Sequence, residues 1–218
     1  MITHHPGEEL VAAYAAGTLD EASSLAIATH LTLCPSCRHA FLEFEALGAA
    51  LVDEMSVVPM AQDAFAATMA RARAGVELRL DRPPSPARQR QPAVLPLPLQ
   101  NYVGGDLAAA KWRPLGPGIH HMPLISADGV TARLLRIAPG KSVFAHSHGG
   151  SELTLVLKGS YEAGGERFAR GDLEMADDSV NHRPVAGMED VCVCLAVTDA
   201  PLRFDNWLGR LMQPFIGI

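Results

Sequence analysis

The chain has 218 residues, 48% of them hydrophobic, which is enough for one large domain or two modest ones with real cores. Its formal net charge of −6 disfavours nucleic acid as a direct partner, because phosphate binding usually needs a clustered basic surface. Neither a signal-peptide pattern nor an apolar stretch of about 18 residues occurs, so we expect a soluble, cytoplasmic protein without a membrane partner. In a reducing compartment its four cysteines should stay as thiols or bind metal rather than form disulfides.

Helical spacing of apolar residues dominates the chain from residue 8 to about residue 55. A short helix is expected over residues 8–16, with Gly17 at its end, and a second helix follows it. Pro35 fits the first turn of a third helix. The apolar stripe of this third helix comprises Phe44, Leu47, Leu51 and Met55.

The densest group of potential metal ligands is the segment HLTLCPSC, which runs from His30 to Cys37. His30 and Cys34 are four residues apart and share one helix face, while Cys37 falls in the first turn of the next helix. An imidazole and two thiolates that converge in this way form a tetrahedral zinc site lacking one ligand. Alternatively, the cysteines are small buried hydrophobes or a thioredoxin-like dithiol, although such a dithiol follows a β-strand.

The fourth ligand of this site has three candidates, which are His4, His5 and His39. His39 lies two residues beyond Cys37, turned by about 200° around the same helix, so it cannot easily face the same ion. Position therefore favours His4 or His5, and spacing alone leaves both open.

A fourth helical pattern runs from residue 61 to about residue 80, beyond a break at Val57-Val58-Pro59. A lone amphipathic helix beyond such a break often docks into a groove of a partner. The alternative is that it packs on the first three helices as ordinary core. Its apolar stripe comprises Phe65, Met69, Ala72 and Val76.

Residues 81–98 contain six prolines, at positions 83, 84, 86, 92, 96 and 98. Proline at this density should exclude helix and sheet and favour an extended, semi-rigid spacer. We therefore expect three parts, which are a helical domain over residues 1–80, a linker over 81–98 and a second domain over 99–218.

After this linker the pattern changes to short strands separated by glycine-containing turns, which is typical of an all-β sandwich or barrel. The clearest strands are expected at 131–137, 153–157 and 191–197. Cys192 and Cys194 alternate on the last of these, so both side chains point to one side. Buried among apolar residues they would be inert, whereas beside a metal they could be oxidised.

Gly140, His146, His148, Glu152 and Gly159 stand at the spacing of the first cupin motif, and this pattern is specific. The two histidines share one face of a strand, and Glu152 begins the next strand, where it can face the same point. Imidazole nitrogens together with one carboxylate would suit zinc, iron, manganese or nickel.

The fourth ligand of this site is expected from the second cupin motif, in which His182 stands eleven residues after Gly171. This motif departs from the usual pattern, because Asp177, Ser179 and Ala186 replace its proline, glycine and asparagine. The turn before His182 should therefore be less rigid than usual. The alternative is a barrel whose histidines no longer bind metal, as in seed-storage proteins.

Taken together, the chain resembles the ChrR family of zinc-dependent anti-sigma factors over essentially its whole length. The resemblance implies a small zinc-binding helical bundle followed by an all-β cupin barrel, the double-stranded β-helix, and it selects His5 over His4 as the fourth zinc ligand. The residues that carry it are His5, YAAGTL at 14–19, His30, Cys34 and Cys37, then His146, His148, Glu152 and His182, Cys192-Val193-Cys194, and the C-terminal LMQPF.

The resemblance further implies that the zinc domain sequesters an extracytoplasmic-function sigma factor. The cupin domain, with Zn²⁺ or another divalent metal, would release it on sensing singlet oxygen, an organic peroxide or an electrophile. No catalytic and no organic-cofactor residues are expected. The alternative is a metal-dependent cupin enzyme, a dioxygenase or isomerase with an accessory zinc domain, but no positioned acid, base or substrate clamp is evident. A DNA-binding zinc protein is disfavoured by the charge.

Overall fold

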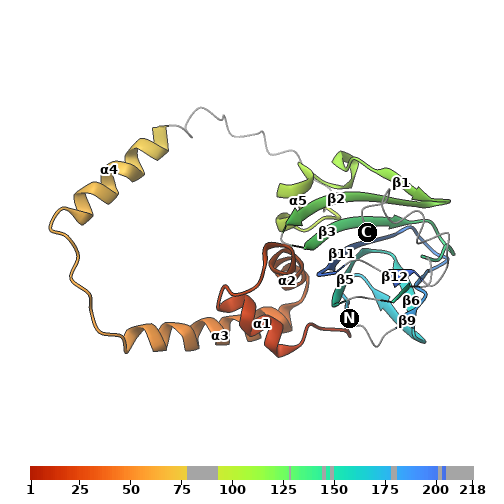
Figure 1. Cartoon of the computed structure of the whole chain (residues 1–218), viewed down its shortest axis with the longest axis horizontal. Helices are drawn as coiled ribbons and strands as arrows, with labels where there is room; N and C mark the ends of the chain where they lie inside the picture. Colours follow the sequence, from red (N-terminus) through yellow and green to blue (C-terminus); the bar gives the residue numbers. More distant parts are fainter. Residues whose placement is uncertain are drawn as a thin grey trace. The chain divides into compact units, whose positions relative to one another are not determined.

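A computed structural model describes residues 1–77, 93–127, 129–143, 146–147, 150–177, 181–200 and 203–204 of the chain (Figure 1). The chain divides into two compact units. The larger unit comprises residues 1–48 together with those from 93 onward, and the smaller unit comprises residues 49–92. The chain thus leaves the larger unit at Gly48 and re-enters it at Ala93.

Three helices occupy the N-terminal region as the apolar spacing predicts, namely α1 (Glu8–Ala15), α2 (Glu21–Leu33) and α3 (Pro35–Asp53). The carboxylate of Asp20 caps α2 by accepting a hydrogen bond from the amide of Ser23 at 2.9 Å. Cys34, between α2 and α3, has the extended conformation that a following proline favours. The junction between the two helices is therefore set by the local sequence.

Helix α4 (Ala64–Glu77) lies in the smaller unit and leaves its apolar stripe accessible. The Phe65 side chain is 78% exposed, and Met69 is exposed as well. The two alternatives for this helix, docking into a partner and packing on the first three helices, therefore stay predictions. The side chain of Val76 and residues 78–80 lie outside the described residues.

Helix α5 (Leu97–Val103) begins within the stretch whose prolines were expected to exclude a helix, so that expectation is wrong at the end of the stretch. Pro96 precedes the helix and Pro98 lies in its first turn, where a proline removes no intrahelical hydrogen bond. Residues 78–92 lie outside the described part, and domain boundaries near residues 80 and 98 stay a prediction.

All described strand pairs are antiparallel, and they form a six-stranded sheet in the order β1-β2-β3-β11-β5-β8 and two three-stranded sheets, β10-β6-β7 and β12-β4-β9. The observed bounds of β3, β5 and β11 agree with the predicted strands to within one residue at each end. The strands are β1 (Arg113–Gly116), β2 (Ile119–Ala127), β3 (Val130–Ile137), β4 (His146–Ser147), β5 (Glu152–Lys158), β6 (Ser160–Ala163), β7 (Glu166–Ala169), β8 (Leu173–Ala176), β9 (Asn181–His182), β10 (Val185–Ala186), β11 (Cys192–Thr198) and β12 (Arg203–Phe204).

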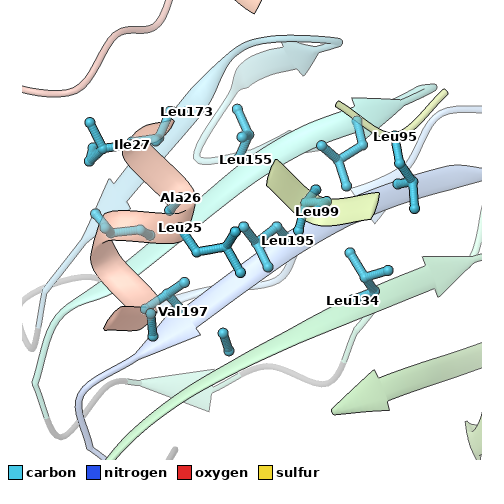
Figure 2. Packing of buried hydrophobic residues seen from close by; sticks show 14 of the residues in the cluster. Leu25, Ala26, Ile27, Leu95, Leu99, Leu134, Leu155, Leu173, Leu195 and Val197 are labelled. Atoms are coloured by element: carbon cyan, nitrogen blue, oxygen red, sulfur yellow. The ribbon is translucent and has the colours of Figure 1, made fainter. Parts of the chain in front are cut away.

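The six-stranded sheet buries side chains on both faces, because alternate residues of a strand point to opposite sides. On the outer face, Leu195 and Val197 of β11 belong to one hydrophobic cluster with residues of α2 and α5 (Figure 2). On the inner face, Cys192 belongs to a second cluster with Val156 and Tyr161. The N-terminal helices and the sheet therefore share a single core, which contains Leu25, Ala26, Ile27, Leu95, Leu99, Leu134, Leu155 and Leu173.

Candidate metal centres

The described residues contain one cluster of metal-ligand type, formed by His5, His30, Cys34 and Cys37. One ligand atom from each of these residues lies within 4.8 Å of those of the other three. The Nδ1 atom of His5 is 3.4 Å from the Sγ atom of Cys34 and 3.3 Å from that of Cys37. The four residues expected to bind zinc therefore converge, although His5 is far from the others in the sequence.

The other two histidine candidates lie elsewhere. The ring of His4 packs against Phe168, with 4.3 Å between ring centroids, and its Nε2 atom is 3.5 Å from Glu166. His39 is exposed on α3, where it pairs with Glu43 four residues further on. The structure thus places His5 in the cluster, in agreement with the choice that the resemblance makes between His4 and His5.

His30 is the most deeply buried member of the cluster, with no exposed side-chain surface. Neither of its ring nitrogens has a hydrogen-bond partner of normal geometry. Burial lowers the pKa of His30 to about 4, although the nearby backbone of Gly171 opposes the shift. A buried neutral imidazole without hydrogen bonds fits a metal ligand, because coordination would satisfy one of its nitrogens.

The two thiols of the cluster have opposite pKa shifts. Burial raises the pKa of Cys37 to about 11, and the neighbouring Cys34 adds to the rise. Burial also raises the pKa of Cys34, but hydrogen bonds from Ser36 and Cys37 more than offset it, so the net pKa is lowered. Without a cation the pair would carry at most one negative charge at neutral pH. A bound divalent cation would stabilise both thiolates.

The separations in the cluster fit zinc. A tetrahedral ion with Zn–S of about 2.3 Å and Zn–N of about 2.0 Å places sulfur and nitrogen about 3.5 Å apart. The two sulfur–nitrogen distances of 3.4 and 3.3 Å from His5 are close to that value. With four protein ligands no coordination position is open for chemistry, so such a site would be structural.

The cupin ligands are only partly described. Strands β4 and β9 pair with His146 directly opposite His182, so the two backbones are adjacent. Glu152 begins β5, and its buried carboxylate accepts a hydrogen bond of 2.8 Å from the hydroxyl of Thr154. The side chains of His146 and His182, and all of His148, lie outside the described residues.

Arg133 is a polar residue of the sheet that sequence analysis missed. It is 7% exposed, and its Nη2 atom donates a hydrogen bond of 3.1 Å to the hydroxyl of Thr131. Burial lowers its pKa, and the nearby Glu152 carboxylate opposes the shift, so the two charges stabilise each other. Alternation could have revealed Arg133, since Ala132 and Leu134 belong to the outer face of β3.

Cys192 and Cys194 are both buried, and both have free thiols. The adjacent Cys192 and burial raise the pKa of Cys194 well above its ordinary value, and the carboxylates of Glu152 and Glu174 add to this rise. The raised pKa and the burial make Cys194 a weak nucleophile.

A zinc-type cluster on a helical region, joined to a sandwich of antiparallel sheets, defines a protein of the zinc-finger and cupin type, and comparison with known proteins supports this class. Residues 8–38 match a family described as a putative zinc finger. Residues 100–201 match the ChrR cupin-like domain. The expected fold class is thereby confirmed.

The chain belongs to the ChrR family of anti-sigma factors. It is 44% identical over 217 residues to the anti-sigma-E factor ChrR of Cereibacter sphaeroides, which covers 100% of this chain and 99% of that protein. It is also similar to a chain in the crystal structure of Rhodobacter sphaeroides SigE in complex with the anti-sigma ChrR, with a TM-score of 0.74 and 40% identity over 91% of this chain and 99% of that one. The prediction of a regulator rather than an enzyme is confirmed.

No helix within the described ranges is long and apolar enough to cross a membrane.

Proposed function

We propose that this protein sequesters an extracytoplasmic-function sigma factor and releases it when the cupin domain senses oxidative stress, either singlet oxygen or an organic peroxide or electrophile. The sigma factor acts on RNA polymerase, so the protein would work in the cytoplasm. The solved relative with the TM-score of 0.74 is a complex of ChrR with SigE, which supports a sigma factor as the partner.

The observation that carries this proposal is the apolar surface of the smaller unit. Its side chains are 59% exposed at Leu51, 69% at Met55 and 78% at Phe65. Several large apolar side chains exposed along one short stretch commonly mark a protein interaction site. Val57, Val58 and Met60 extend this surface between α3 and α4.

Two metal centres would serve this function in different ways. His5, His30, Cys34 and Cys37 would hold a zinc ion that links the N-terminal segment to the α2–α3 junction. His146, His148, Glu152 and His182 would hold Zn²⁺ or another divalent cation in the cupin domain, with Arg133 and Thr154 orienting Glu152. The cupin metal would provide a site that a reactive oxygen species or peroxide can alter.

Sensing requires that the cupin domain favours one of two states of the sigma-binding part. A signal can shift the equilibrium between these states only if it binds to, or reacts with, one state more strongly than the other. The shared core of α2, α5 and the six-stranded sheet offers a physical path between the cupin domain and the helices.

The test is co-expression of the full chain with each extracytoplasmic-function sigma factor of the same genome, followed by affinity capture. We expect one sigma factor to be retained, and Phe65→Glu to reduce its retention at least 10-fold. Met188→Glu is the matched control, because Met188 is 80% exposed but belongs to the larger unit. Retention of no sigma factor, or equal loss in both variants, would contradict the proposed partner and surface.

A further inference from the structure

The N-terminal segment lies on the turn between β7 and β8 of the cupin sheet. The backbone amide of Leu173 donates a hydrogen bond of 3.1 Å to the carbonyl of His4. Gly171 has a φ of +96°, and a Cβ atom at this position would lie 2.5 Å from the side chain of Ile2. Only glycine combines this backbone conformation with so close an approach. The turn therefore forms a close-fitting contact surface for residues 2–4.

Asp172, in the same turn, fixes the segment with its carboxylate. Its Oδ1 atom accepts hydrogen bonds from the amides of Thr3 at 2.6 Å and His4 at 3.0 Å. Its Oδ2 atom accepts one of 2.8 Å from the amide of Ala169 in its own turn. Asp172 is only 2% exposed, and hydrogen bonds to a buried carboxylate are stronger than those between neutral groups.

The pKa of Asp172 reflects this arrangement. Burial raises the pKa, but the amides of Thr3, Ala169 and His4 more than offset burial, so the net pKa lies below its ordinary value. The carboxylate is therefore ionised in the folded protein at neutral pH.

His5 directly follows this anchored segment, and its position differs in kind from that of the other three ligands of the cluster. His30, Cys34 and Cys37 come from α2, α3 and the junction between them and are buried, whereas His5 is exposed and precedes the first helix. The helix junction brings the first three ligands together, and the backbone of Gly171 in the cupin turn also lies near His30. What holds the backbone of residues 2–4 is the cupin turn, chiefly through Asp172.

We propose that Asp172 positions His5 for metal binding, so that the β7–β8 turn of the cupin sheet determines how firmly the N-terminal site holds its zinc. Asp172 is a positioning residue and not a ligand, since its carboxylate is occupied by backbone amides. The inference rests on the proposed zinc site. Linkage is reciprocal, so zinc at the cluster would also strengthen the attachment of the N-terminal segment to the turn.

The experiment uses the full chain with Co²⁺ in place of zinc. Among the two proposed sites only the N-terminal one has thiolate ligands, so the thiolate-to-cobalt absorption reports on that site alone. The rate at which a chelator removes this absorption is measured for the wild type, Asp172→Ala and Asp172→Asn. Asparagine keeps one acceptor oxygen and preserves the fold if alanine does not. Thermal unfolding of each variant is recorded in parallel.

Asp106→Ala is the matched control. The Asp106 carboxylate also accepts two backbone amide hydrogen bonds, from Val94 at 3.0 Å and Leu95 at 2.8 Å. Among the hydrogen bonds of the described residues, only one joins this segment to the β7–β8 turn. In it the Arg170 side chain donates to the Val94 carbonyl. The control thus removes a similar anchor that does not lead to His5.

We expect Asp172→Ala to release the metal about 10- to 100-fold faster than the wild type, the range for loss of a residue that orients a ligand. Asp172→Asn should give an intermediate rate and Asp106→Ala the wild-type rate. Adding Asp172→Ala to His5→Ala should bring no further acceleration, because the carboxylate acts through His5.

The inference is overturned by a wild-type release rate in Asp172→Ala, by an equal acceleration in Asp106→Ala, or by an undiminished effect of Asp172→Ala in the His5→Ala background. Absence of the thiolate-to-cobalt absorption in the wild type would overturn the zinc site and the inference together. Failure to capture a sigma factor contradicts only the proposed partner, because metal release is measured without one.

Discussion

The Sγ atom of Cys34 lies 3.4 Å from the Nδ1 atom of His5, although 29 positions separate the two residues in the chain. Their contact joins the N-terminal segment to the end of α2, so that Glu8–Ala15 is enclosed in a loop closed at the cluster. A metal at this point would reduce the conformational freedom of the unfolded chain and stabilise the folded one.

Replacing Cys34 and Cys37 by serine should abolish sigma binding and disorder α1. Apparent zinc binding energies of about 10 kcal/mol or more exceed what so small a helical region can supply. Residues of α2 that contact the sheet should stay more protected, because they share its core. Amide hydrogen exchange and sigma capture measure both effects, with Cys192→Ala as the control. Unchanged sigma affinity in the double variant would sink the prediction.

The variant His148→Ala should lose most of the cupin metal and leave the thiolate site loaded. Removal of one ligand from a four-ligand site strongly weakens binding, and the N-terminal cluster already has four ligands of its own. Metal analysis of the full chain should fall from close to two ions to close to one. His120→Ala serves as the control, because His120 lies near the start of β2 and is partly exposed. Two ions retained in His148→Ala would show that His148 is not a ligand.

Ile27→Ala should destabilise the whole larger unit by about 2–5 kcal/mol, the range for truncating a buried isoleucine. Ile27 has no exposed surface and lies in the core that α2 shares with the sheet. Leu47→Ala is the control, since Leu47 is 59% exposed, and its effect should stay within about 0.5 kcal/mol. Denaturant unfolding followed separately by helical and aromatic signals would show one transition. Two separate transitions, with only the helical one shifted, would contradict a common core.

A chain that ends near Asp81 should still bind and silence its sigma factor but no longer respond to stress. Binding is assigned to residues 1–80 and sensing to the cupin domain. Such a chain should also unfold at a lower temperature than the full chain, because Leu25 and Ile27 would lose the sheet that covers them. A sigma-dependent reporter with and without singlet oxygen or organic peroxide measures the response. Loss of silencing, or an undiminished response, would refute the division of labour.

Cys192 and Cys194 should react slowly with iodoacetamide in the folded protein and quickly in denaturant. Both thiols are buried, and the pKa of Cys194 is raised well above its ordinary value by Cys192 and by burial. Mass spectrometry of each peptide over time gives the two rates. Modification of Cys194 in the folded state at the denatured rate would show that the thiol is accessible and available for direct sensing.

The sequence predicted those features that depend on local chemistry. Helices α1 to α3 follow from apolar spacing, the α2–α3 junction from Pro35, and the cluster of His30, Cys34 and Cys37 from that junction. The choice of His5 over His4 required the family resemblance. Residue spacing could not supply it, because the contacts that direct the two rings, such as that of His4 with Phe168, are long-range.

Contacts between distant segments account for what sequence analysis missed. Helix α5 was hidden by the prolines, since a proline in a first turn looks the same in the sequence as one in a spacer. The role of Asp172 had no local signature, because the two amides that it holds in the N-terminal segment, those of Thr3 and His4, are far from it in the sequence. The two-residue strand β4 is too short for a periodic pattern to reveal.

The smaller unit is inserted between two parts of the larger one, and this excursion of the chain, residues 49–92, has a consequence for proteolysis. A protease that cuts once within this excursion would produce two polypeptides, and the first would still hold α2 against the sheet of the second through their common core. The nicked protein should therefore migrate as one particle on a sizing column and separate only in denaturant. A cut that destroys sigma binding would then leave the two pieces joined.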